Sequence, residues 1–190
     1  MALSAGKLQD SIIALTDPTH SSFPGWPATA ADAAANWAAA ARSYYEDLAL
    51  HGILLQQTSI NAVIDPLYTV ALDAGEAAFS TTLAAYFSDV VTGQASKGLD
   101  TSFVAFIAAY LAVVSPPLAA IPPPLGPLIL VAPSGLFGHP GIETALSGFL
   151  VPGGFPTNPH PPAAATATAV DLWTKTGASQ LSTTTPETWK

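Results

Sequence analysis

The chain has 190 residues, a length that suits one domain built around a single hydrophobic core. Its net charge is −8 with only five Lys or Arg residues, which argues against a nucleic-acid surface and against docking on anionic lipid, because both need clustered cations. The absence of cysteine excludes disulfides, zinc–thiolate sites and thiol nucleophiles.

The first predicted helix covers residues 4–16. Leu8, Ile12 and Leu15 recur at helical spacing and form one apolar stripe. Pro18 ends this helix, because a proline disfavours the helical conformation of the residue before it.

The loop that follows carries two aromatic residues, Phe23 and Trp26, in the sequence FPGWP. Its prolines restrict the backbone and make the loop stiff. Two interpretations stay open: the rings clamp the loop onto the protein's own core, or they anchor it in a neighbouring subunit, as buried aromatic residues often do at interfaces. Phe23 and Trp26 are therefore candidate interface residues.

The second predicted helix covers residues 29–55. Thr29 and Asp32 have the spacing of a capping box, which satisfies free backbone N–H groups at a helix start. The apolar stripe consists of large residues: Trp37, Tyr44, Leu48 and Leu55. Alanine fills much of the remaining surface and favours the helical state.

The third and fourth predicted helices cover residues 65–93 and 101–114. Asp65 and Pro66 match an N-cap followed by proline at the first helical position. The fourth is apolar on all sides, so we expect it to be the central and most buried helix. Across these two helices and the second one, the predicted core residues are Trp37, Tyr44, Leu48, Leu72, Phe79, Leu83, Phe103, Phe106 and Leu111.

Residues 115–138 form a long Pro-rich and apolar segment. Proline recurs too often for a regular helix, and Ser115-Pro116-Pro117 should stop the preceding one. The segment is too apolar to lie free in water, so we expect an ordered loop laid across a neighbouring subunit. Residues 128–131 could also pair briefly as a strand. The candidate contact residues are Leu118, Ile121, Leu125, Leu128, Ile129, Leu130 and Val131.

The C-terminal part adds a short predicted helix at residues 141–150 and another at 162–176, which Gly177 ends. The Ser/Thr-rich tail, residues 178–190, should be loosely held, although Trp189 could anchor it. The predicted fold is therefore all-α, an irregular bundle of five to seven helices in one domain, residues 1–177, with a long Pro-rich ordered loop.

Residues suited to chemistry are scattered in this sequence. Ser134 lies near His139 and Glu143, but no G-x-S-x-G motif surrounds it. No two histidines are spaced as metal ligands on one helix face, and no glycine-rich phosphate loop occurs. We therefore expect no catalytic, cofactor-binding or metal-binding residues, and a protein that is not an enzyme.

Charge is also unevenly distributed. Only 9% of the residues are charged, against roughly 25% in an ordinary soluble domain, and Glu143 is the only charged residue between Asp100 and Asp171. A free monomer needs a charged surface to stay dispersed. The sequence thus predicts a permanently packed component of an assembly, in which it contacts other structural proteins and further copies of itself.

The opening MALSAGKLQDSI, the Ala-rich helix with Trp37 and the stretch AAATATAVDLWTKTG resemble small Ala-rich helical structural proteins of tailed bacteriophage particles. The resemblance implies a virion component of the neck, tail or baseplate, assembled in the host cytoplasm. One alternative is a membrane-active or pore-forming protein using residues 103–131, although the twelve apolar residues 103–114 are shorter than the ~20 of a membrane span. A second alternative is a small hydrolase without a recognisable motif.

Overall fold

A computed structural model describes residues 3–48, 58–88, 95–122, 127–134, 158–181 and 186–190. Its helices are α1 (Ala5–Thr16), α2 (Ala30–Tyr45), α3 (Thr58–Ser88), α4 (Ala95–Ala119) and α6 (His160–Thr174), and its strands are β1 (Leu128–Val131), β2 (Ala178–Leu181) and β3 (Glu187–Thr188). The predominantly helical character expected from the sequence is confirmed. The predicted helix at residues 141–150 lies outside the described residues.

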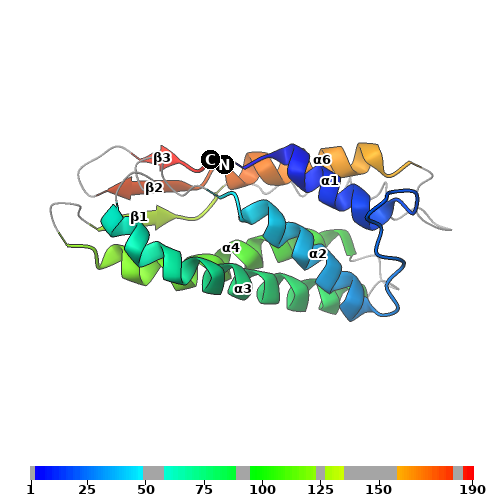
Figure 1. Ribbon diagram of the computed structural model, residues 1–190, viewed down its shortest axis with the longest axis horizontal. Coiled ribbons are helices and arrows are strands. Elements are labelled where there is room, and N and C mark those ends of the chain that lie inside the picture. The colour runs from blue at the N-terminus through cyan, green and yellow to red at the C-terminus, as the bar shows by residue number, and fades with distance from the viewer. Residues whose placement is uncertain (1–2, 49–57, 89–94, 123–126, 135–157, 182–185) are drawn as a thin grey trace.

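The helices lie roughly along the long axis of the molecule (Figure 1). α3 and α4 form a long antiparallel hairpin, and α2 packs across α3. α1 packs against both α2 and α6, so that α1 and α6 cover the side of α2 away from the hairpin. The small antiparallel sheet, in the order β1-β2-β3, continues this arrangement at one end and contacts α4 through β1.

α2 shows how local sequence sets helix ends. The predicted capping box is present: Asp32 N donates to Thr29 Oγ1 and Thr29 N donates to Asp32 Oδ2, both at 3.1 Å. The helix ends at Tyr45, well before the predicted end at residue 55. The Tyr68 hydroxyl of α3 donates to the backbone carbonyl of Glu46 and satisfies a group at this helix end.

The helices α3 and α4 both contain prolines at which the sequence analysis expected them to start or stop. α3 begins at Thr58 and contains Pro66, so the predicted start at Asp65 is wrong. α4 continues through Pro116 and Pro117, so the predicted stop after Val114 is wrong. Pro116 and Pro117 lie in the last turn and lack the N–H that would donate to the carbonyl four residues earlier, so the continuation has a local backbone cost. Continuing the helix buries Leu118 completely, which offsets part of that cost.

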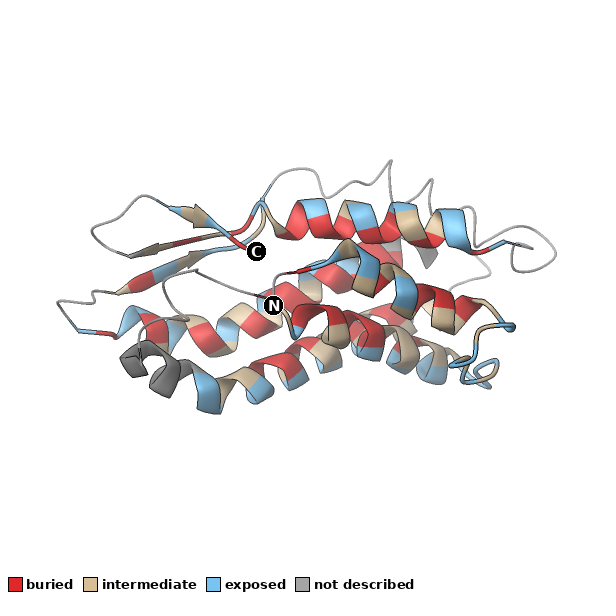
Figure 2. Ribbon diagram, turned by 45° about the horizontal axis from the view of Figure 1, so that its top comes forward, coloured by how far each residue is buried: buried red, intermediate tan, exposed pale blue. Residues whose placement is uncertain are grey.

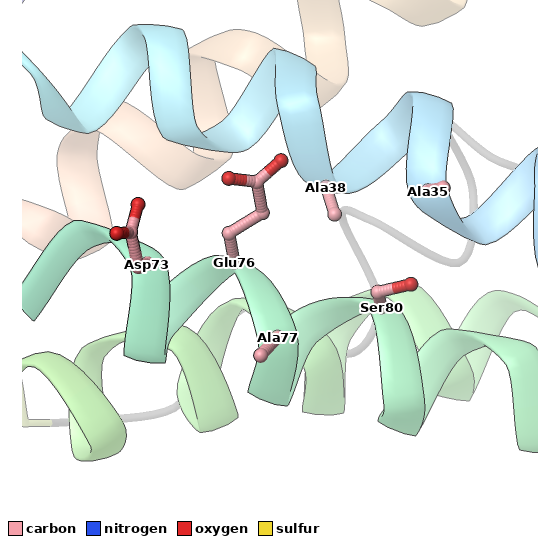
Figure 3. Close-up of a pocket in the computed structure, with 6 residues that line it drawn as sticks. All are labelled: Ala35, Ala38, Asp73, Glu76, Ala77 and Ser80. Atoms are coloured by element: carbon pink, nitrogen blue, oxygen red, sulfur yellow. The ribbon is translucent and has the colours of Figure 1, made fainter. Parts of the chain in front are cut away.

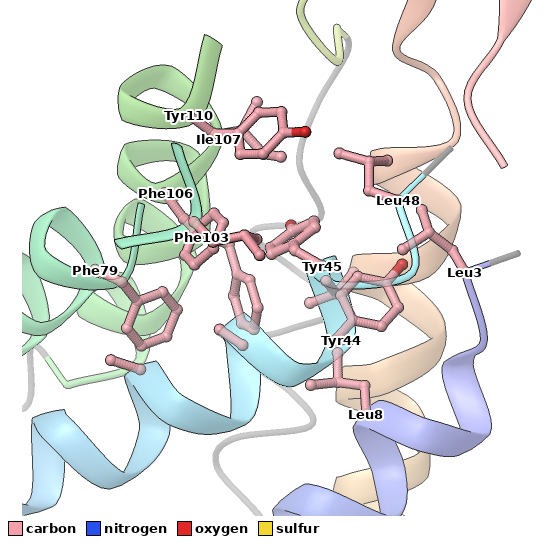
Figure 4. Close-up of a cluster of buried hydrophobic side chains, with 14 of the residues drawn as sticks. Leu3, Leu8, Tyr44, Tyr45, Leu48, Phe79, Phe103, Phe106, Ile107 and Tyr110 are labelled. Atoms are coloured by element: carbon pink, nitrogen blue, oxygen red, sulfur yellow. The ribbon is translucent and has the colours of Figure 1, made fainter. Parts of the chain in front are cut away.

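The core lies between the hairpin and the helices that cover it (Figure 4). Tyr45 of α2 stacks on Phe106 of α4 at a ring-centroid distance of 4.6 Å, and Phe79 of α3 meets Phe103 edge-to-face at 5.0 Å. The predicted core residues that are buried are Tyr44, Leu48, Leu72, Phe79, Leu83, Phe103 and Phe106. The other two, Trp37 and Leu111, are partly buried against the core.

Two glycines allow α3 and α4 to approach closely. A Cβ at Gly75 would lie 2.6 Å from the ring of Phe106, and a Cβ at Gly98 would lie 2.3 Å from the Tyr86 side chain. Real Cβ atoms do not approach so closely. These contacts also set the register of the hairpin, which places Gly75 level with Phe106 and Tyr86 level with Gly98.

Two described parts of the C-terminal tail, residues 178–181 and 186–190, contribute to the small sheet. β2 pairs with β1, with Ala178 opposite Val131 and Leu181 opposite Leu128, and β3 extends the sheet. Trp189 is only 1% exposed, and its Nε1 donates to Ser179 Oγ at 3.0 Å. Trp189 thus fills a space in the described fold, and its polar atom has a partner there.

Candidate functional site

Three of the predicted contact residues lie in the protein's own core. Leu118 and Leu128 are almost completely buried, and Ile121 is 8% exposed. The reason is that the helix continues past its prolines and β1 pairs with β2, so these side chains cover intramolecular surface. In the single chain these three side chains are covered by the protein itself, and their role as contact residues stays a prediction. Leu125 lies outside the described residues.

The other predicted contact residues of this segment lie in β1. Ile129 is 50% exposed and Val131 is 48% exposed, whereas Leu130 is half-buried. Side chains two residues apart point to the same face of a strand. Ile129 and Val131 therefore form a small exposed apolar pair on one face of the sheet.

The predicted aromatic loop lies on the surface between α1 and α2. Trp26 is 52% exposed, and its ring meets that of Phe23 edge-to-face at a centroid distance of 5.0 Å. Gly25, between them in sequence, has a φ of 91°, a conformation that favours glycine. The turn thus holds the two rings together while leaving much of Trp26 in solvent.

The outer face of the α3–α4 hairpin is exposed, although α4 was predicted to be the most buried helix. On α4 the buried side carries large residues such as Phe103, Phe106 and Tyr110. The opposite side is exposed, as pale-blue positions along the hairpin show in Figure 2. We call this outer face the hairpin underside and define it by the exposed residues Val70, Thr81 and Ala85 of α3 and Thr101, Val104, Ala108 and Ala112 of α4.

Sequence reasoning missed the hairpin underside because every residue from 103 to 114 is apolar. A usable signal was side-chain size: alanine occupies the outer positions 108 and 112, and aromatic residues occupy the inner ones. Within the described residues, 98–119 is the one helical stretch long and apolar enough to cross a membrane, with a mean hydropathy of 1.8 and 39% of its most apolar window buried. Core helices of soluble proteins meet the same criterion.

A shallow groove of about 350 Å³ lies between α2 and α3 (Figure 3). Ala35, Ala38 and Ala77 form its apolar part, and Asp73, Glu76 and Ser80 form its polar part. In the turn of α2 beyond Ala38, Arg42 donates to Asp73 and, at 3.1 Å, to Glu76.

The carboxylates beside this groove belong to an ion network. Arg42 Nε also lies 3.7 Å from Glu46 of its own helix. The hydrogen bond to Asp73, followed by that to Glu76, raises the pKa of Arg42 against the opposing effect of burial. Because the guanidinium holds both Asp73 and Glu76, these carboxylates are arranged to fix α2 on α3 rather than to move protons.

A buried polar network joins α2 to α6. The Tyr44 hydroxyl donates to Asp171 Oδ1 at 2.9 Å, and Lys175 Nζ donates to Asp171 Oδ2 at 2.8 Å. The Tyr45 hydroxyl lies 3.2 Å from Thr174 Oγ1. Burial is the main cause that raises the pKa of Tyr44 and of Tyr45, so both stay neutral. The network thus gives each of the two carboxylate oxygens of Asp171 a donor.

The histidines are placed apart. His20 Nδ1 accepts a hydrogen bond from Ser22 N at 3.2 Å, and His160 Nε2 lies 3.3 Å from Asp17 Oδ2. His51 and His139 lie outside the described residues, as does Glu143, so the grouping of Ser134, His139 and Glu143 is not tested. Over the described part of the chain, no group of three or more His, Asp or Glu side chains could hold a metal ion.

Comparisons of the chain with protein-family models, with curated proteins and with solved structures give no match. The function therefore has to be inferred from the surfaces and clusters of this molecule. Among the described residues, those clusters are mostly satisfied internally, whereas the apolar surfaces are not covered.

Proposed function

We propose that the protein is a non-enzymatic structural component of a multi-subunit assembly and acts by packing against other subunits. The observation that carries the proposal is the exposed apolar surface. Large hydrophobic side chains are exposed at several separate places of the described fold: Trp26, Val70, Val104, Ile129, Val131 and Leu172. Single exposed residues are common in monomers. Here they lie on a surface with few charges between them.

Most of the Lys and Arg side chains that could help to keep a monomer soluble form ion pairs with acidic side chains of the same chain. Lys7 pairs with Asp47 at 2.9 Å, Lys175 pairs with Asp171, and Arg42 is held by acidic side chains of α2 and α3. These are three of only five Lys and Arg residues. Paired charges on a molecule so poor in them contribute little to keeping copies apart in solution.

The kind of assembly is inferred from the sequence resemblance described above. A bacteriophage virion, with this protein in its neck, tail or baseplate, suits an Ala-rich helical chain with an apolar surface. Its partners would be other structural proteins of the particle together with further copies of itself, and it would need no cofactor.

The proposal is tested by following the chain in a particle preparation. Particles purified on a density gradient should contain the chain at a fixed ratio to other structural proteins. Replacing Ile129 and Val131 by Asp should reduce its incorporation, because two exposed apolar contacts would become charged, while far-UV circular dichroism stays helical. A chain that stays soluble and outside every particle would refute the proposal.

A membrane-active protein is the second candidate, and the observation that favours it is the apolar stretch 98–119 of α4. In the structure this stretch packs its large side chains against α2 and α3. A bilayer role would require the hairpin to open. Flotation of the purified chain with liposomes would favour this candidate over the first.

A further inference from the structure

We infer that residues 186–190, which contain β3 and Trp189, are exchanged between two copies of this chain in the assembly. In that arrangement the segment of each copy occupies, in its partner, the site that it fills within the single chain. We call this site the Trp189 socket and define it by Gly177, Ala178 and Ser179. The inference rests on the proposed function, because it names one partner of the assembly and the contact that holds it.

The Trp189 socket fits an indole ring closely. Trp189 is 1% exposed, its Nε1 donates to Ser179 Oγ at 3.0 Å, and its backbone N donates to the Gly177 carbonyl at 2.9 Å. A Cβ at Gly177 would lie 2.4 Å from the ring, so a glycine at this position leaves the room that the ring needs. A buried aromatic ring whose polar atom has a partner is a typical anchor of a strong interface. The socket is therefore suited to hold the same segment when another chain supplies it.

The rest of the segment is attached by few contacts. β3 is the outermost strand of the sheet (Figure 1), and it pairs with β2 through two residues, Glu187 opposite Ser179 and Thr188 opposite Ala178. Of the described helices and strands, only β2 makes an extensive contact with β3. A short edge strand that is held mainly by one ring can open without unfolding the helices. Residues 186–190 can thus leave the socket and return to it as one unit.

Exchange needs no new complementarity, because the contacts in the exchanged pair are those of the single chain. The two arrangements differ in the connection between β2 and β3. Four residues, 182–185, join Leu181 to Pro186 in the sequence, and an extended chain of this length reaches about 17 Å. A connection this short gives the segment an effective concentration on the order of millimolar at its own socket. Copies packed side by side in an assembly compete with that concentration.

A second copy is favoured over an unrelated partner because the structure identifies the occupant of the socket. That occupant is this chain's own segment, and another copy brings Trp189 at the same distance from the paired residues of β3. Charge also permits the exchange. Each chain has a net charge of −8, but residues 186–190 contain one acidic and one basic residue, Glu187 and Lys190. The segment therefore docks on another copy without bringing the excess negative charge of its own chain into the socket.

Cysteine pairing tests the exchange directly, because the chain contains no cysteine. Two variants of the full chain, Ala178→Cys and Thr188→Cys, are mixed at about 1 mM, equilibrated and then mildly oxidised. Residues opposite each other in an antiparallel pair have Cβ atoms about 5 Å apart, which allows a disulfide. In an exchanged pair these two cysteines face each other across the two chains.

The control mixture pairs Thr188→Cys with Ala39→Cys, whose cysteine is exposed on α2. Mass spectrometry distinguishes the mixed dimer from dimers of one variant. The mixed dimer of Ala178→Cys and Thr188→Cys should form at least about tenfold faster than the control dimer, because only the first pair is held together by the exchange. Equal rates in the two mixtures would overturn the inference.

Both mixtures are then repeated with chains that also carry Trp189→Ala, after far-UV circular dichroism has shown that these chains remain helical. Without the ring the segment has no anchor in the socket, so the preference for position 178 over position 39 should be lost. A preference that persists without Trp189 would also overturn the inference. The proposed function fails separately, if the chain is absent from every particle, whatever the cross-linking shows.

Discussion

At the residue scale, Asp171 is a buried charged residue with a hydrogen-bond donor for each carboxylate oxygen. Its two oxygens accept from Tyr44 and Lys175 in a site where the side chain is 11% exposed. Burying a carboxylate costs free energy unless hydrogen bonds and an opposite charge compensate for the lost water. Here both are present. Removing one partner is therefore more harmful than removing a surface charge.

Replacing Asp171 by Ala should lower the free energy of unfolding by about 1–3 kcal/mol, because the Tyr44 hydroxyl would lose its acceptor inside the protein. Urea denaturation measures this change. Asp10→Ala is the matched control: Asp10 lies exposed on α1, so its replacement should change stability by less than about 0.5 kcal/mol. Equal losses in both variants would contradict the assignment of the network.

The contact between Gly75 and Phe106 gives a second prediction at this scale. Gly75→Ala should destabilise the fold by about 1–3 kcal/mol, because the added methyl group would overlap the ring and push α3 from α4. Gly6→Ala in α1 is the control, where a methyl group has room and alanine favours the helix. The melting temperature should therefore fall for Gly75→Ala and rise for Gly6→Ala. A stabilised Gly75→Ala variant would show that the hairpin is less tightly packed.

At the scale of elements, the sequence predicted the existence of the described helices better than their ends. Apolar spacing placed α1 and α6 well, and the capping box marked the start of α2, whose end at Tyr45 was predicted ten residues too late. The start of α3 and the end of α4 were predicted wrongly from Pro66 and Pro116, because tertiary packing outweighed the local backbone cost of these prolines. Of the sheet, the sequence suggested only the strand at residues 128–131, which forms β1, and its partner β2 was missed. The strands β1 and β2 are far apart in sequence, so no local pattern announces their pairing.

Trp189 holds the sheet at its C-terminal edge, and its removal should show this. Trp189→Ala should cost about 3–5 kcal/mol, because a large buried ring leaves a cavity and Ser179 loses a hydrogen bond. The comparison is Trp26→Ala, which removes an aromatic ring from an exposed loop and should cost much less. If Trp189→Ala and Trp26→Ala have the same melting temperature, the C-terminal tail does not contribute to the stability of the fold.

The turn after α1, in which Asp17 accepts hydrogen bonds from Thr19, should depend on pH in the acidic range. Hydrogen bonds from Thr19, with a smaller effect of His160, hold the pKa of Asp17 below its ordinary value of 3.8. A carboxyl with a lowered pKa stabilises the fold above its ordinary value, and this contribution is lost as the pH falls through the folded value. The melting temperatures of wild type and Asp17→Asn should thus differ at neutral pH and converge below about pH 4. A constant difference would exclude this linkage.

At the scale of the whole molecule, the candidate surfaces were only partly accessible to sequence reasoning. Ile129 and Val131 are exposed as a contact role requires, whereas Leu118 and Leu128 pack inside. The exposed pair and the buried pair both lie in apolar sequence, so only the three-dimensional fold tells them apart. The hairpin underside could not be recognised for the same reason, since burial depends on which side of α4 meets α2.

The four tryptophans of this chain also lie in different surroundings. Trp173 and Trp189 are at most 8% exposed, whereas Trp26 is half in solvent. Ultraviolet excitation of the native protein would therefore give emission from two shielded indoles, from the partly buried Trp37, and from Trp26, which a dissolved quencher such as iodide can reach. If a neighbour covered the aromatic loop, quenching would fall and the emission would shift to shorter wavelength. The protein thus contains its own optical probe of occupancy at the α1–α2 loop, without an added label.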